Sequence, residues 1–110
     1  AKIGNRVGDF SFAIQRVIQD SPYSIVKEYT GHGVGYELHE DPHIFNYGKR
    51  NTGQKLVAGM TIAIEPIIAM GSPKNKTLKD GWTVVTLDGK DACQWEHFGV
   101  VAENGLDIFA

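Results

Sequence analysis

The chain has 110 residues, of which 42% are hydrophobic, 10% aromatic and 22% charged, with a formal net charge of −2. This composition predicts one soluble globular domain over residues 1–110, and the absence of a basic block excludes nucleic acid as a partner. No apolar run reaches the about 20 residues that a membrane helix needs, and no secretory signal pattern opens the chain. We therefore expect a cytoplasmic protein without a membrane partner. The single cysteine, Cys93, excludes a disulfide framework and multi-cysteine zinc sites.

The first predicted element is a helix over residues 6–19. Its apolar residues recur at the spacing of one helix face, namely Val7, Phe10, Ile14, Val17 and Ile18. Ser21 and Pro22 end the helix, because proline disfavours helical geometry in the residue before it and cannot donate a backbone hydrogen bond.

The segment after this helix is predicted to change from a strand to a loop. Residues 23–30 favour a strand, and residues 31–35 contain three glycines, which indicate a bend or a close approach of another segment. This cluster is no dinucleotide-binding fingerprint, because its spacing is wrong and Pro42 prevents a following helix. Residues 40–53 are polar and rich in turn formers, so we expect a long loop with at most one short strand.

The C-terminal half of the chain is predicted to consist of strands. The strand-like segments are residues 60–68, 81–87, 92–102 and 106–109. Asp88-Gly89 and Asn104-Gly105 have the composition of hairpin turns between these segments. Trp82 and Trp95 are expected in the core. One helix followed by a run of antiparallel strands predicts an α+β fold.

Three of the four histidines lie within twelve residues of one another and close to several acids, which suggests a metal site. The segment from His39 to His43 matches the H-E-x-x-H pattern of zinc peptidases literally. That pattern requires both histidines on one face of a helix, and Pro42 would break this helix, so we reject the match. His43 and His97 are predicted to be surface or hydrogen-bonding residues.

Glu65 is the most informative acid of the chain, because it lies within the apolar segment 61–66. An ionised carboxylate in such surroundings needs a metal ion or a basic partner such as Lys or Arg, and both alternatives remain open. Glu96 lies in a predicted central strand, on the same face as Gln94 and Phe98. One histidine with two carboxylates is a ligand set that suits Mn, Fe, Co or Zn.

Five motifs follow one another along the chain: Gly31-His32-Gly33-Val34-Gly35, His39-Glu40-Asp41-Pro42, Gly59-Met60-Thr61-Ile62-Ala63-Ile64-Glu65-Pro66, Asp80-Gly81-Trp82-Thr83 and Gln94-Trp95-Glu96-His97. In this order they resemble the C-terminal half of a type I methionine aminopeptidase. The resemblance covers nearly the whole chain and implies one half of the pseudo-symmetric pita-bread fold. Prolidase and aminopeptidase P share the glycine-flanked histidine and the Ile-Glu-Pro segment, whereas the last two motifs favour the methionine enzyme.

The resemblance also implies residue roles. The implied metal ligands are His32, Glu65 and Glu96. The implied ions are divalent Co, Fe, Mn or Zn, two in the complete site. Glu65 would also help to activate water, and His39 would hydrogen-bond the substrate as a catalytic residue. Trp82 and Leu38 would be walls of the pocket for the methionine side chain. The implied reaction is metal-dependent removal of the N-terminal methionine from nascent proteins.

The family's site also uses two aspartates and a histidine from an N-terminal half, which these 110 residues do not contain. Three ligands are expected to hold one metal ion at most, so we expect the isolated chain to be inactive or weakly active. The expected partners are a missing N-terminal half or a second copy of the chain, together with the N-terminal peptide of nascent proteins. The alternative is a non-catalytic half-domain that binds metal or another protein.

Overall fold

The computed structural model describes all 110 residues and contains one helix and ten strands. The helix α1 spans Val7–Gln19 and is neither long nor apolar enough to cross a membrane. The strands are β1 Ser24–Ile25, β2 Gly31–Gly33, β3 Glu40–Ile44, β4 Thr61–Ile64, β5 Ile67–Ala69, β6 Asn75–Thr77, β7 Val84–Thr86, β8 Ala92–Gln94, β9 His97–Val101 and β10 Leu106–Ile108.

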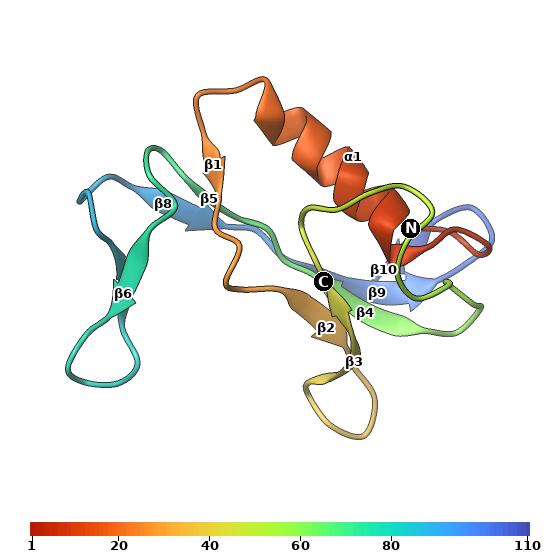
Figure 1. Ribbon diagram of the computed structural model, residues 1–110. Coiled ribbons are helices and arrows are strands. Elements are labelled where there is room, and N and C mark those ends of the chain that lie inside the picture. Colours follow the sequence, from red (N-terminus) through yellow and green to blue (C-terminus); the bar gives the residue numbers. More distant parts are fainter.

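The strands form three antiparallel sheets. The largest has the order β10-β9-β4-β2-β3, the second has the order β1-β5-β8, and β6 pairs with β7. The chain runs from β4 directly into β5 and from β8 directly into β9, so two neighbouring segments join the larger sheets. β6 belongs to an arm that extends away from α1 and the largest sheet (Figure 1). The predicted α+β class, with one helix before a mainly antiparallel sheet, is confirmed.

The hydrophobic core lies between α1 and the five-stranded sheet. Its buried members are Val7, Ile44, Leu56, Ile62 and Val101. Only 15 of the 110 residues are buried, so this core is small. Along β4, Ile62 points into the core, whereas Ala63 and then Glu65 line a cavity on the other face. The candidate site therefore lies on the sheet face that α1 leaves open.

The helix is confirmed close to its predicted bounds, and its ends are held by hydrogen bonds. The carboxylate of Asp9 accepts from the backbone N–H groups of Arg6 at 2.7 Å and Asn51 at 2.9 Å. These bonds, that of Asn51 above all, lower the pKa of Asp9. At the other end the Ser21 hydroxyl donates to the Ile18 carbonyl oxygen over 2.7 Å, which satisfies one of the last helical acceptors.

The long predicted strands are interrupted where the chain passes between the two larger sheets. Residues 60–68 divide into β4 and β5 at Glu65-Pro66, because proline cannot donate to a sheet ladder. Residues 92–102 divide into β8 and β9 around Trp95-Glu96. The predicted strand 23–30 is reduced to the two residues of β1, and the predicted loop 40–53 contains the whole of β3.

Two further predictions need correction. Asp88-Gly89 is no hairpin turn, because it links β7, which pairs with β6, to β8, which pairs with β5. Asn104-Gly105 does join the paired strands β9 and β10. Trp82 and Trp95 are 88% and 68% exposed, and Val17 on the helix is exposed as well. Both tryptophans lie outside the five-stranded sheet, Trp82 between β6 and β7 and Trp95 between β8 and β9, so the core does not cover them.

Candidate metal centre

The sheet brings the three predicted metal ligands together from three separate segments. His32 lies in β2, Glu65 directly follows β4, and Glu96 directly precedes β9. β4 lies between β2 and β9 and pairs with both, and Ala63 of β4 lies opposite His32 on one side and Phe98 on the other. As a result, one ligand atom from each of the three residues lies within 4.8 Å of the others.

The imidazole of His32 is oriented as a metal ligand would be. Its Nδ1 lies 2.9 Å from the carbonyl oxygen of Gly33, and because a carbonyl only accepts, Nδ1 carries the proton. In the neutral ring Nε2 is then an acceptor, and it faces Oε1 of Glu65 at 3.3 Å. Two acceptors at this distance need a cation between them, either a proton or a metal ion. Metal-binding histidines commonly have this second-nitrogen bond to a carbonyl group.

Glu65 lacks the lysine or arginine partner that was one of its two predicted alternatives. Its Oε1 faces His32, and its Oε2 accepts a hydrogen bond of 2.7 Å from Nε2 of Gln94. Neither of the two cavities that Glu65 lines contains a Lys or Arg. Burial and, next, the nearby Glu96 carboxylate raise the pKa of Glu65, against the opposing effect of His32. A divalent cation would relieve both unfavourable effects, so the residues fit a metal ion.

This pKa shift predicts how stability depends on pH in the absence of metal. The folded chain keeps a proton on Glu65 above its ordinary pKa of 4.5, where the unfolded chain has lost it, so stability falls as the pH rises through that range. The neutral variant Glu65→Gln should therefore be more stable than the natural chain at about pH 7, with the difference vanishing below about pH 4. Urea unfolding with a chelator present measures both values. A difference that grows on acidification would contradict the expectation.

His39 and Leu38 lie on the loop between β2 and β3, beside the three ligands. The ring centroids of His39 and His32 are 4.2 Å apart, with the planes inclined by 56°. Leu38 and His39 line a cavity of about 400 Å³ together with all three predicted ligands. The side chain of Leu38 is 69% exposed, so it forms a rim of this cavity rather than a closed wall.

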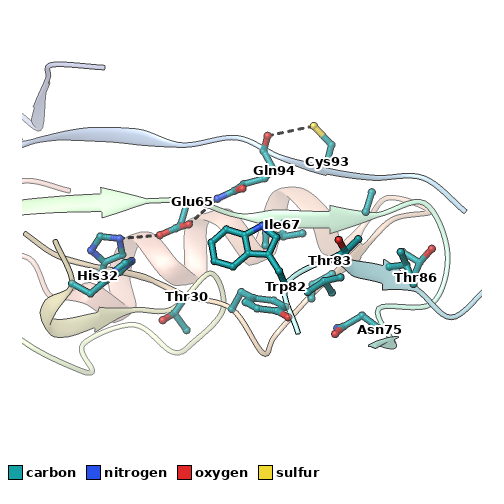
Figure 2. Close-up of a pocket in the computed structure, with 16 residues that line it drawn as sticks. Thr30, His32, Glu65, Ile67, Asn75, Trp82, Thr83, Thr86, Cys93 and Gln94 are labelled. Atoms are coloured by element: carbon teal, nitrogen blue, oxygen red, sulfur yellow. Dashed lines mark hydrogen bonds and ion pairs between the residues drawn. The ribbon is translucent and has the colours of Figure 1, made fainter. Parts of the chain in front are cut away.

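Trp82 lines a second cavity, of about 710 Å³, that reaches His32, His39 and Glu65. Figure 2 shows His32 and Glu65 at one end of this cavity, with the ring of Trp82 beside them. The turn that carries Trp82 is fixed by Asp80, whose carboxylate accepts from the backbone N–H groups of Trp82 at 3.0 Å and Thr83 at 2.9 Å. Trp82 is therefore a cavity residue and not the core residue that composition suggested.

Gln94 is a residue of the site whose contact with Glu65 the sequence did not predict. Sequence reasoning placed it on the face of Glu96, whereas its hydrogen bond goes to Glu65. The contact depends on the antiparallel pairing of β5 with β8, in which Ile67 lies opposite Gln94. The alternation of side chains along β8 indicated the face on which Gln94 lies, but the partner strand could not be identified from the sequence.

The remaining histidines make hydrogen bonds outside the ligand group, as predicted. Nδ1 of His43 lies 3.3 Å from the hydroxyl oxygen of Thr30, and Nε2 of His97 accepts from the indole N–H of Trp95 at 3.1 Å. His43 lies in β3, in extended backbone, so the helical H-E-x-x-H arrangement is absent, as Pro42 indicated.

The chain matches the model of metallopeptidase family M24 over residues 1–103. With this extent of match, the chain belongs to metallopeptidase family M24. The use of divalent metal in this family agrees with the ligand group formed by His32, Glu65 and Glu96.

Individual relatives are methionine aminopeptidases. Methionine aminopeptidase 1 of Bacillus subtilis is 50% identical over 108 residues, which are 98% of this chain and 44% of the relative. The enzyme of Escherichia coli K12 is 41% identical over 97% of this chain and 40% of its own length. The solved structure of methionine aminopeptidase from Thermotoga maritima matches with a TM-score of 0.94 at 45% identity, over 98% of this chain and 43% of that chain. These likenesses confirm the predicted fold, one half of a pita-bread fold. The chain spans less than half the length of these relatives.

Proposed function

We propose that this chain forms part of a metal-dependent aminopeptidase that removes the N-terminal methionine from newly made proteins in the cytoplasm. The observation that supports this most is the orientation of His32, whose Nε2 faces the carboxylate of Glu65 beside Glu96 while its Nδ1 is held by the Gly33 carbonyl. Its relatives at 41% to 50% identity carry the name methionine aminopeptidase. We do not propose the prolidase or aminopeptidase P alternative.

His32, Glu65 and Glu96 would hold divalent Co, Fe, Mn or Zn, since they offer one imidazole nitrogen and two carboxylates. A bound ion of this kind polarises a substrate carbonyl and lowers the pKa of a water molecule. Glu65 would receive the proton of the attacking water. Gln94 would keep Glu65 in place, because its amide holds the oxygen that does not face His32.

The residues beside the ligands would bind the substrate. His39, in contact with His32, would donate a hydrogen bond to the carbonyl group of the scissile peptide bond. Leu38 and Trp82 would contact the methionine side chain, each from one of the two cavities that meet at Glu65. An apolar side chain gains free energy from such burial in proportion to the area removed from water.

We further propose that residues 1–110 are the C-terminal half of a catalytic domain. The chain matches 40% to 44% of its relatives, and the face that carries the site exposes Leu38 and Trp82. Large exposed apolar side chains beside a cavity are typical of a surface that another segment covers. The remaining ligands, and the second metal ion, would come from an N-terminal half or from a second copy of this chain.

The test is release of methionine from a Met-Ala-Ser peptide with Co²⁺, Mn²⁺ or anaerobic Fe²⁺. It uses this chain alone and a chimera in which the chain replaces the segment of Bacillus subtilis methionine aminopeptidase 1 that it matches. We expect turnover by the chimera, and little or none by the chain alone because the ligand set is incomplete. A chimera that folds and binds metal without releasing methionine would favour the non-catalytic half-domain instead.

A further inference from the structure

The loop between β2 and β3, residues 34–39, carries Leu38 and His39 but has almost no packing of its own. Tyr36 is fully exposed, and Leu38 is 69% exposed. At its start the loop is held by Thr61, whose backbone carbonyl accepts from the N–H of Val34 at 3.0 Å and whose hydroxyl donates to the Val34 carbonyl. Burial therefore cannot fix the middle of the loop, and its hydrogen bonds must do so.

The carboxylate of Glu40 lies inside this loop. Its Oε1 accepts a hydrogen bond of 2.8 Å from the backbone N–H of Glu37. The N–H of Gly35 in turn donates to the carbonyl of Glu37 over 3.1 Å. A Cβ atom on Gly35 would lie only 2.4 Å from Oε2 of Glu40. The loop thus wraps around one carboxylate, and a side chain at residue 35 would displace this carboxylate.

The backbone of Glu40 is anchored in the sheet. Glu40 is the first residue of β3 and pairs with Gly33 of β2, after an irregularity in the register between His32 and Gly33. Its side chain therefore connects a paired strand with a loop whose middle residues are exposed. Glu40 lines neither of the two cavities at the ligand group, so its carboxylate serves the loop and not the metal.

We propose that Glu40 is a positioning residue, which holds the loop 34–39 so that His39 stays against His32 and Leu38 stays at the cavity rim. Glu40 is also the glutamate of the rejected H-E-x-x-H match, and the role proposed for it requires no contact with a metal ion. The effect on the loop stands by itself, and the effect on catalysis rests on the function proposed above. Loss of Glu40 should impair turnover while the three ligands still bind metal.

Three variants test this role. Glu40→Ala removes the acceptor of the Glu37 N–H, whereas Glu40→Gln keeps an oxygen acceptor at the same place. Glu37→Ala is the matched control, since it removes the same charge from the same loop but leaves the backbone N–H that Glu40 binds. Each variant is made in the chimera defined above, beside the unchanged chimera.

The first two measurements, amide hydrogen exchange and Mn²⁺ binding, do not depend on peptidase activity. In Glu40→Ala the exchange of the Glu37 amide hydrogen should accelerate about tenfold, as expected for loss of a hydrogen bond to a charged acceptor. Titration calorimetry should find Mn²⁺ affinity within about twofold of the unchanged chimera, because second-sphere losses of about tenfold or more occur where a ligand's own partner is removed. The Glu37→Ala variant should match the unchanged chimera in both.

Kinetics then separate positioning from general stability. We expect kcat for Met-Ala-Ser to fall about 10- to 100-fold in Glu40→Ala, the range for displacement of a catalytic group by about 1 Å, and to recover largely in Glu40→Gln. Gly35→Ala should impair the unchanged chimera but have no further effect in the Glu40→Ala background, because the carboxylate that its Cβ would strike is then absent.

Several results would overturn the proposal. One is unchanged exchange of the Glu37 amide hydrogen in Glu40→Ala. Another is a loss of Mn²⁺ affinity in Glu40→Ala as large as its loss of kcat. A third is an equal loss of kcat from Gly35→Ala in the unchanged chimera and in the Glu40→Ala background. An unchanged chimera that releases no methionine would instead count against the proposed function, while amide exchange and Mn²⁺ binding would still decide whether Glu40 holds the loop.

Discussion

Replacing Glu65 with alanine is expected to weaken divalent metal binding at least about 100-fold, more than the loss of a second-sphere partner causes. Glu65 is the central member of the candidate ligand group, because its two oxygens contact His32 and Gln94 and its carboxylate lies beside Glu96. Without it only His32 and Glu96 of the candidate group remain in the isolated chain, and two ligands hold a divalent ion poorly. Methionine release by the chimera should fall by at least the same factor.

Titration calorimetry with Mn²⁺ and the peptide assay measure the two effects. Glu103→Ala is a suitable control, since Glu103 is an exposed carboxylate in the turn between β9 and β10, at the opposite end of β9 from the ligands. Metal affinity and turnover that survive in Glu65→Ala, with the control unchanged, would mean that the ion is held elsewhere and that the candidate centre is wrong.

The second large effect is expected from alanine at Gly31 or Gly33, the two glycines that flank His32. A Cβ on Gly31 would lie 2.1 Å from the carbonyl oxygen of Ala63, and one on Gly33 would lie 2.2 Å from that of Asp41. Both obstacles are backbone atoms of paired strands, so β2 would have to move. We expect the free energy of unfolding to fall by about 3 kcal/mol or more, at the upper end of overpacking effects.

The displacement should also reduce metal affinity, because β2 carries His32 and β4 leads to Glu65. Urea unfolding followed by circular dichroism measures the stability, in parallel with Mn²⁺ titration. Gly48→Ala is the matched control, since its Cβ would meet the nearest atom, Cβ of Ser11, at an ordinary 3.5 Å. If Gly31→Ala unfolds at the same urea concentration as this control, the close approach of the strands is not as the structure has it.

Much of this protein could be predicted from local patterns in the sequence. The helix follows from apolar spacing and from Pro22, because both act within a few residues. The apolar segment around Glu65 indicated that this acid needs a compensating partner, and the resemblance carried by the motifs around His32, Glu65 and Glu96 implied these three residues as metal ligands. Pro42 likewise was sufficient to exclude a helical zinc motif.

The partners of these residues were decided by the tertiary structure alone. The pairing of β4 with both β2 and β9 brings the three candidate ligands together, and strand pairing depends on contacts between segments far apart in the chain. The same holds for Gln94, which reaches Glu65 only because β5 and β8 pair, and for Trp82, which is exposed because the turn between β6 and β7 lies outside the core. Local propensities act over a few residues, whereas burial and strand register are properties of the whole folded chain.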